Sequence, residues 1–182
     1  MIIVKHKSTL QASFDKHYPG HKIIDVTSKA PAPFVKLSPF YPIGGIPVPL
    51  SEGHFAQSVE GIWQGLKVFE NVGIDTKKLE VTTMKGLKRT VRKFGNVKGH
   101  QAGINNNNLL SYIAARKQIY LPAYRWVLDH KVSDVLQLIK NEAAQCPIIL
   151  LDYETNGDVE NVSKPLSHAY LVKYYLENNF PV

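Results

Sequence analysis

Residues 55–69 read Phe-Ala-Gln-Ser-Val-Glu-Gly-Ile-Trp-Gln-Gly-Leu-Lys-Val-Phe, and this stretch decides the fold. Its apolar residues are spaced by four, three, four and three positions, at Phe55, Val59, Ile62, Leu66 and Phe69. That spacing places the five side chains on one face of an α-helix. The sequence therefore predicts a helix over residues 55–69 whose apolar face is buried in the core.

A second row of side chains runs along the same predicted helix. Glu60, Gln64 and Lys67 are spaced by four and three positions, so they project on one side, next to the apolar face and close to Trp63. Glu60 could act as a base toward water or stabilise a cationic transition state, Gln64 could bind a base or ribose edge, and Lys67 could hold a phosphate. The alternative is an ordinary solvated face of an amphipathic helix.

Outward from this helix, the sequence predicts an α+β domain that is mostly helical, with a small sheet. Strands are expected at residues 2–4, 22–26 and 147–151, of which the last is the central one, and weaker strands at 34–37 and 46–48. Further helices are expected from Leu109 to Tyr120, from Pro122, from Ser133 and from Ser163, where each serine serves as an N-cap. No boundary divides the chain, so residues 1–182 are predicted to form a single domain.

Composition limits the class of protein. The chain has 182 residues, of which 44% are hydrophobic and 20% charged, and this is typical of a globular domain rather than a disordered chain. Its one cysteine, Cys146, excludes an intramolecular disulfide framework and a cysteine-rich zinc site, and it favours the reducing cytoplasm. No run approaches the roughly 18 apolar residues of a membrane span, so we expect no membrane association.

The positive charge is concentrated in one segment. Residues 75–98 hold eight basic and two acidic residues, a net charge of +6 out of the +7 of the whole chain. Such a segment can bind the phosphates of a nucleic acid or of a single nucleotide, and the alternative is a solvated, lysine-rich surface. Phe94 is the one aromatic residue within it, so the segment shows no stacking platform for single strands.

Two stretches together resemble a known family. Residues 34–42 read Phe-Val-Lys-Leu-Ser-Pro-Phe-Tyr-Pro, and residues 58–69 read Ser-Val-Glu-Gly-Ile-Trp-Gln-Gly-Leu-Lys-Val-Phe. They resemble the NADAR (YbiA-like) superfamily, which shows a Leu-Ser-Asn-Phe-Tyr-Pro type segment followed by a helix with Ser-Val-Glu-His, Gln and Lys. The similar region covers about residues 23–69.

The resemblance implies an N-glycosidase that cleaves ADP-ribose-type or ribosylamine-phosphate nucleotides, with a YbiA-like fold and no cofactor or metal. Glu60 is then the catalytic carboxylate, because cleavage of an N-glycosidic bond builds positive charge on the ribose. The substrate-binding residues would be the motif side chains together with cations that hold the phosphates: Phe40, Tyr41, Ser58, Trp63, Gln64, Lys67, Lys88, Arg89, Arg92 and Lys93.

Three departures from the family pattern keep other functions open. Pro39 stands in place of the usual Asn, Gly61 in place of the usual His, and residues 151–160 in place of a C-terminal Trp-Gly signature. The chain resembles a divergent branch such as tailed phages encode, which would act in the host cytoplasm. The alternatives are a non-enzymatic phage or host accessory protein with a degenerate pocket, and a nucleic-acid-binding module that uses residues 75–98.

A few other residues could carry chemistry. Asp152 follows the central strand and could be the acid of the site, and with Asp158 and Glu160 it could bind Ca²⁺ or Mg²⁺. The spacing does not fit an EF-hand loop, so a turn with capping carboxylates is favoured. Three histidines are predicted to be structural or exposed rather than catalytic, namely His54, His100 and His168.

Overall fold

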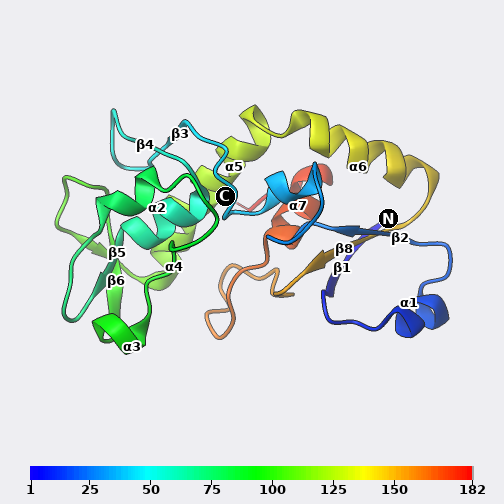
Figure 1. Ribbon diagram of the computed structural model, residues 1–182, viewed down its shortest axis with the longest axis horizontal. Helices are drawn as coiled ribbons and strands as arrows, with labels where there is room; N and C mark the ends of the chain where they lie inside the picture. Colours follow the sequence, from blue (N-terminus) through cyan, green and yellow to red (C-terminus); the bar gives the residue numbers. More distant parts are fainter. Residues whose placement is uncertain (182) are drawn as a thin grey trace. The chain divides into compact units, whose positions relative to one another are not determined.

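The strands that the sequence predicted at residues 2–4, 22–26 and 147–151 form one three-stranded parallel sheet. Its strands, in the spatial order β1-β8-β2, are β1 (Ile2–His6), β8 (Ile148–Asp152) and β2 (Lys22–Asp25). Every residue of the central strand β8 is buried, which is why its sequence is a continuous apolar run. Because both outer strands run parallel to β8, the carboxyl ends of all three meet at one edge (Figure 1).

The computed structural model describes residues 1–181 and confirms the predicted α+β class, mostly helical with small sheets. Its internal contacts divide the chain into two units. Unit 1 comprises Met1–Ser38 and Leu128–Pro181, and unit 2 comprises Pro39–Val127. The prediction of a single YbiA-like domain over residues 1–182 stays a prediction.

Unit 1 consists of the parallel sheet and the helices that pack with it. These are α1 (Gln11–His17), the 3-10 helix η1 (Phe34–Leu37), α6 (Ser133–Gln145) and α7 (His168–Leu176). Helix α7 contacts β1 and β8. Phe14 of α1 packs with Ile149 and Leu151 of β8, so the sheet and α1 share one apolar cluster.

Unit 2 contains residues 55–69, the stretch that includes Glu60, Gln64 and Lys67. Helix α2 (Val59–Gly65) is buried along its whole length and is followed by an antiparallel sheet of β5 (Lys67–Phe69), β6 (Val97–Gln101) and β7 (Leu109–Leu110). The remaining elements are β3 (Ile46–Pro47), β4 (Phe55–Ala56), the 3-10 helix η2 (Thr76–Glu80), α3 (Val91–Phe94), α4 (Tyr112–Ala115) and the π-helical turn η3 (Arg116–Tyr120). Helix α5 (Leu121–His130) continues η3 and ends in unit 1.

The predicted helix over residues 55–69 is too long at both ends. Phe55 lies in β4, where its side chain is 61% exposed, and Lys67–Phe69 form β5. The helix begins after Ser58, whose hydroxyl accepts a hydrogen bond from the Gly61 N–H, and ends where β5 pairs with the distant β6. Long-range strand pairing therefore replaces the last helical turn that the periodicity predicts.

Other element boundaries also differ. Residues 34–37 form a 3-10 helix rather than a strand, and Leu109–Leu110 form a strand rather than the start of a helix. The last helix begins after Ser167, not Ser163, because the Ser167 hydroxyl accepts the Tyr170 N–H. Helix α6 begins at Ser133 itself, and its N-cap Val132 provides no side-chain cap. Among residues 1–181, no helix is both long and apolar enough to cross a membrane.

Candidate functional site

Glu60 and Gln64 form a buried hydrogen-bonded pair on α2. The Gln64 side-chain amide donates to Glu60 Oε1 over 2.8 Å, and its own Oε1 accepts the backbone N–H of Arg89 at 3.0 Å. Both contacts agree on which end of the amide is oxygen, so the orientation of Gln64 is fixed. The i,i+4 spacing predicted that the two side chains lie on one side of the helix, and the structure shows that they are hydrogen bonded there.

The carboxyl group of Glu60 is electrostatically unusual. Burial raises the pKa of Glu60, while the hydrogen bond from Gln64 and the charges of Lys67 and Lys88 act in the opposite direction. Burial likewise lowers the pKa of the Lys67 ammonium, which the charge of Glu60 partly offsets. Both shifts favour the neutral form of the group, and buried groups with shifted pKa values are candidates for acid–base chemistry.

The segment at residues 39–42 contacts the start of α2 through Pro39. The Glu60 backbone N–H donates to the Pro39 carbonyl at 2.8 Å, so a backbone group of Pro39 makes the contact with α2. The Lys88 ammonium lies over the Phe40 ring, 5.5 Å from its centroid. Phe40 and Tyr41 are both half-buried. Phe40, Lys88, Glu60 and Lys67 are thus connected by contacts and charge.

The Arg89 side chain is used for hydrogen bonds within the fold. Its guanidinium donates to the carbonyls of Gln64, Lys67 and Gly73 at 3.1, 2.6 and 2.6 Å. Its Cζ atom lies 4.9 Å from the Phe69 ring centroid and 5.3 Å from the Phe94 ring centroid. These contacts fasten the loop before α3 to the end of α2, so we assign Arg89 to holding the site together rather than to phosphate binding.

Three other predicted site residues are placed differently from Glu60. The Ser58 side chain is fully buried as the N-cap of α2. Arg92 and Lys93 are exposed on α3, where Lys93 lies 5.2 Å from the Phe94 centroid. Within residues 1–181, neither Arg92 nor Lys93 influences the pKa of Glu60, whereas Lys67 and Lys88 do. Of the predicted cations, Lys67 and Lys88 are therefore the ones whose charges act on the Glu60 carboxyl.

Trp63 is surrounded by rings, one of which sequence reasoning missed. The His100 imidazole lies against the indole with ring centroids 3.8 Å apart, and Tyr112 and Tyr120 approach its edges at 5.6 and 5.7 Å. His100 comes from β6, where it pairs directly with Lys67 of β5. Nothing in the local sequence of His100 signals this contact, because it arises from strand pairing across more than thirty positions.

The structure also explains why position 61 is a glycine. A Cβ atom at position 61 would lie 2.6 Å from the Lys78 carbonyl oxygen and 3.0 Å from Ser58 Oγ. Real Cβ atoms do not come this close to a backbone oxygen, so a histidine has no room here unless η2 moves. The close approach of η2 to α2 therefore requires glycine.

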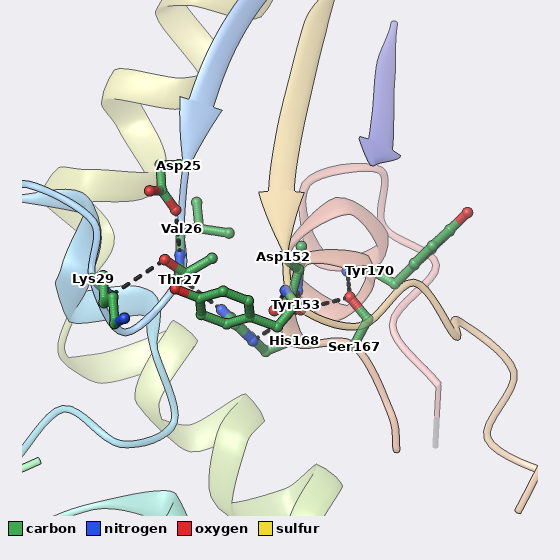
Figure 2. Close-up of polar contacts among 10 residues, drawn as sticks. Asp25, Val26, Thr27, Lys29, Asp152, Tyr153, Ser167, His168 and Tyr170 are labelled. Atoms are coloured by element: carbon green, nitrogen blue, oxygen red, sulfur yellow. Dashed lines mark hydrogen bonds and ion pairs between the residues drawn. The ribbon is translucent and has the colours of Figure 1, made fainter. Parts of the chain in front are cut away.

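Unit 1 holds a second buried polar cluster, at the carboxyl edge of the parallel sheet (Figure 2). Asp152 Oδ2 lies 3.0 Å from His168 Nδ1 and accepts the Ser167 hydroxyl at 2.7 Å, and Asp152 Oδ1 accepts the Tyr153 N–H at 2.7 Å. The other ring nitrogen, His168 Nε2, lies 2.7 Å from the Val26 carbonyl. Both nitrogens of His168 thus face acceptors, which fits a doubly protonated imidazolium.

The ionisation of this cluster follows from its contacts. Burial alone would raise the pKa of Asp152, but the charge of His168 and the hydrogen bonds from His168, Ser167 and the Ala169 N–H lower it to about 2. Burial would lower the pKa of His168, but Asp152 and the Val26 carbonyl raise it. The Ser167 hydroxyl donates to Asp152 rather than to the imidazole, so this is not a nucleophile–base arrangement. We interpret the cluster as a clamp between α7 and the sheet.

The loop after β8 lines a hollow of about 640 Å³ together with Tyr170 and Tyr174 of α7. Its central side chain, Asn156, donates to the carbonyls of Asn161 and Lys164 and accepts the Asp158 N–H. These contacts fold the loop onto itself. Within residues 1–181, no three or more His, Cys, Asp or Glu side chains are grouped so that they could hold a metal ion. Asp152, Asp158 and Glu160, all among these residues, therefore do not form a Ca²⁺ or Mg²⁺ site.

Comparison with known families assigns the chain to one family. A family of unknown function, DUF6939, matches residues 6–172, which is most of the chain and includes parts of both units. The chain belongs to DUF6939. The matched range contains α2, β6 and the clamp residues Asp152 and His168, so DUF6939 encompasses both buried polar clusters. No curated protein matches the DUF6939 chain.

Proposed function

We propose that unit 2 binds a phosphate-bearing, nucleotide-type ligand such as ADP-ribose beside Glu60 and hydrolyses its N-glycosidic bond. The observation that carries the proposal is Glu60, a buried carboxyl with a raised pKa and two lysines close enough to act on it. The resemblance of residues 34–42 and 58–69 to NADAR (YbiA-like) proteins supports the same reaction class. The proposal extends to a divergent, phage-encoded type of NADAR protein acting in the host cytoplasm.

In this reaction water attacks the anomeric carbon of the ribose, and Glu60 takes up the proton that the water loses. The bond to the leaving nitrogen breaks with its electron pair going to that nitrogen, which then takes a proton from solvent. Positive charge develops on the ribose ring as the bond breaks, and an ionised Glu60 stabilises it. Gln64 holds the carboxylate in one orientation through the 2.8 Å hydrogen bond to Oε1.

The phosphates of the ligand need cations with free donors. Lys88 is exposed and Lys67 is half-buried, and the ammonium of each retains its three donors because it makes ring contacts rather than hydrogen bonds within residues 1–181. Phe40, beneath Lys88, offers an apolar surface next to that phosphate position. Binding therefore depends on Lys67 and Lys88 more than on Arg89.

The test is the Glu60→Gln variant, which keeps the size of the side chain and its contact with Gln64 while removing the base. Turnover of an N-ribosyl phosphate substrate is expected to fall at least a hundredfold, the typical contribution of a general base, with affinity within a few-fold. Glu80→Gln is the matched control, because Glu80 is exposed in the same unit and the charge change is identical. Undiminished turnover in Glu60→Gln would contradict the enzymatic function and favour the accessory-protein alternative.

Nucleic acid is the second candidate partner, and the charge of unit 2 favours it. Unit 2 holds twelve basic and five acidic residues, so it carries the entire net charge of +7. Several exposed cations of residues 75–98 form no ion pair within residues 1–181, namely Lys77, Lys85, Arg92 and Lys98. Duplex binding would weaken steeply with salt, with a log–log slope of about −0.9 per neutralised phosphate. Lys77→Met should reduce that slope, whereas Lys67→Met should reduce affinity for ADP-ribose.

A further inference from the structure

His100 is a fully buried polar side chain placed directly beside the proposed site. It lies against the Trp63 indole at 3.8 Å, with the two ring planes inclined by 33°. It also pairs with Lys67 across the β5–β6 ladder, and directly paired residues project from the same face of a sheet. The imidazole is therefore a neighbour of the residue that we expect to hold the ligand's phosphate.

The fold offers no hydrogen-bond partner for this imidazole. Both ring nitrogens, Nδ1 and Nε2, are buried without a partner among residues 1–181. The Trp63 carbonyl slightly favours a charged ring, but it makes no well-formed hydrogen bond with it. Buried polar atoms without partners are destabilising, and a phenylalanine would stack on Trp63 without that cost. Packing alone therefore does not account for a histidine at position 100.

The protonation state of the His100 imidazole limits the chemical groups of a ligand that it can bind. Burial, together with the charge of Lys67, lowers the pKa of His100 to about 3. The ring is thus neutral at physiological pH, with one N–H donor and one bare nitrogen acceptor. Such a ring suits a hydroxyl, which both donates and accepts, better than it suits a phosphate. Among the charged groups of α2 and β5, Lys67 is the one that acts on this ring.

We propose that His100 is a binding residue of the site, and that its neutral imidazole hydrogen bonds with a ribose hydroxyl of the ligand beside Lys67. The inference rests on the proposed function and names the sugar-recognising side chain. Because His100 is fully buried, binding to its imidazole requires a neighbour to move, and its strand partner Lys67 is half-buried with a flexible four-carbon side chain. Movement of the Lys67 head toward a phosphate would uncover the ring next to it.

The experiment compares the natural chain with His100→Phe, His100→Asn and His100→Gln, using calorimetric binding of ADP-ribose and of ribose 5-phosphate. His100→Phe keeps the stacked shape and removes both nitrogens, whereas Asn and Gln retain an amide near Nδ1 or Nε2. His21→Phe is the matched control, because His21 Nε2 in unit 1 is also buried without a partner. Thermal unfolding of every variant shows which chains are folded.

The proposal predicts that His100→Phe binds both compounds about tenfold more weakly, the loss expected for one or two hydrogen bonds, while unfolding at the same temperature or higher. Either the Asn or the Gln variant should retain affinity within about threefold, and His21→Phe should bind as the natural chain does. If the natural chain binds and folded His100→Phe binds equally well, His100 is a core residue and this inference is wrong. If the natural chain binds neither compound, the proposed function itself fails.

Discussion

The two units differ in their balance of charged residues and in the number of ion pairs that these residues form. Unit 1 holds ten basic and ten acidic residues, and the ion pairs found within the units all belong to it, from the exposed Lys36–Asp134 pair to the buried Asp152–His168 pair. Unit 2 has twelve basic and five acidic residues, and within residues 1–181 none of its acidic side chains lies within 4.0 Å of a cationic nitrogen.

The buried histidines show the same contrast. His168 in unit 1 has an acceptor at each ring nitrogen, and His100 in unit 2 has a partner at neither. A polar group that is satisfied within the fold stabilises it, whereas one that is left unpaired is available to a ligand. We therefore propose that unit 1 serves as the scaffold and that unit 2 holds the functional site. The predictions below test this division.

The largest expected effect is that of Asp152→Asn in unit 1. Removing this charge leaves His168 without its buried partner, so the free energy of unfolding should fall by about 3–5 kcal/mol. Asp134→Asn is the control from the same unit, because its ion pair with Lys36 is exposed and should contribute less than about 1 kcal/mol. Urea unfolding at neutral pH measures both. Similar losses in the two variants would contradict the clamp.

The two histidines should give stability opposite dependences on pH. His168 has a raised pKa, so its contribution is complete below the ordinary value of 6.5 and is lost as the pH rises through the raised value. His100 has a lowered pKa of about 3, so the folded state loses stability as the pH falls below 6.5, by about 2 kcal/mol at pH 5.

Urea unfolding of His168→Gln and His100→Phe between pH 5 and 8 checks the two signs. Relative to the natural chain, His100→Phe should be most stabilised at pH 5, and His168→Gln should be most destabilised there. At the acid end, the Asp152 contribution should be lost as the pH falls from 3.8 toward 2. Equal pH dependences in the two histidine variants would show that the two rings do not differ as described.

The smallest effect concerns Gly61. Replacing glycine by alanine inside a helix normally stabilises by up to about 1 kcal/mol. Here the new Cβ would meet the Lys78 carbonyl at 2.6 Å, and overpacking of this kind destabilises by about 1–3 kcal/mol. Gly61→Ala should therefore lose about 1 kcal/mol, whereas Gly73→Ala, where the Cβ would meet no atom within 4 Å, should lose nothing. A stabilised Gly61→Ala would show that η2 does not press on α2.

Local patterns predicted some of these features and failed for others. The sequence predicted strands at residues 2–4, 22–26 and 147–151, and the continuous apolar run at 147–151 marked the central one, but their parallel pairing was not predicted. The spacing of Glu60 and Gln64 predicted that both side chains lie on one side of a helix, which is where they form their hydrogen bond. Lys67, in contrast, fitted the helical period although it belongs to a strand, since β5 is defined by its pairing with β6.

The features set by long-range contacts were beyond local patterns. The hydrogen bonds from Arg89 to three backbone carbonyls depend on where α2 and β5 end. The contact of the His100 ring with Trp63 depends on the register of β6. Residues with the same local sequence could have held a phosphate or faced solvent. Sequence reasoning therefore placed Glu60 and Gln64 on one side of a helix but did not find the ring that lies beside Lys67.

The most direct test of the division between scaffold and site compares the natural chain with Glu60→Gln and Asp152→Asn. The measurement is the release of free base from an N-ribosyl phosphate substrate, normalised to the fraction of folded chain. We predict that Glu60→Gln is folded and inactive, and that the folded fraction of Asp152→Asn turns over at the natural rate. Full activity in Glu60→Gln together with loss of activity in folded Asp152→Asn would place the chemistry in unit 1 and contradict the account.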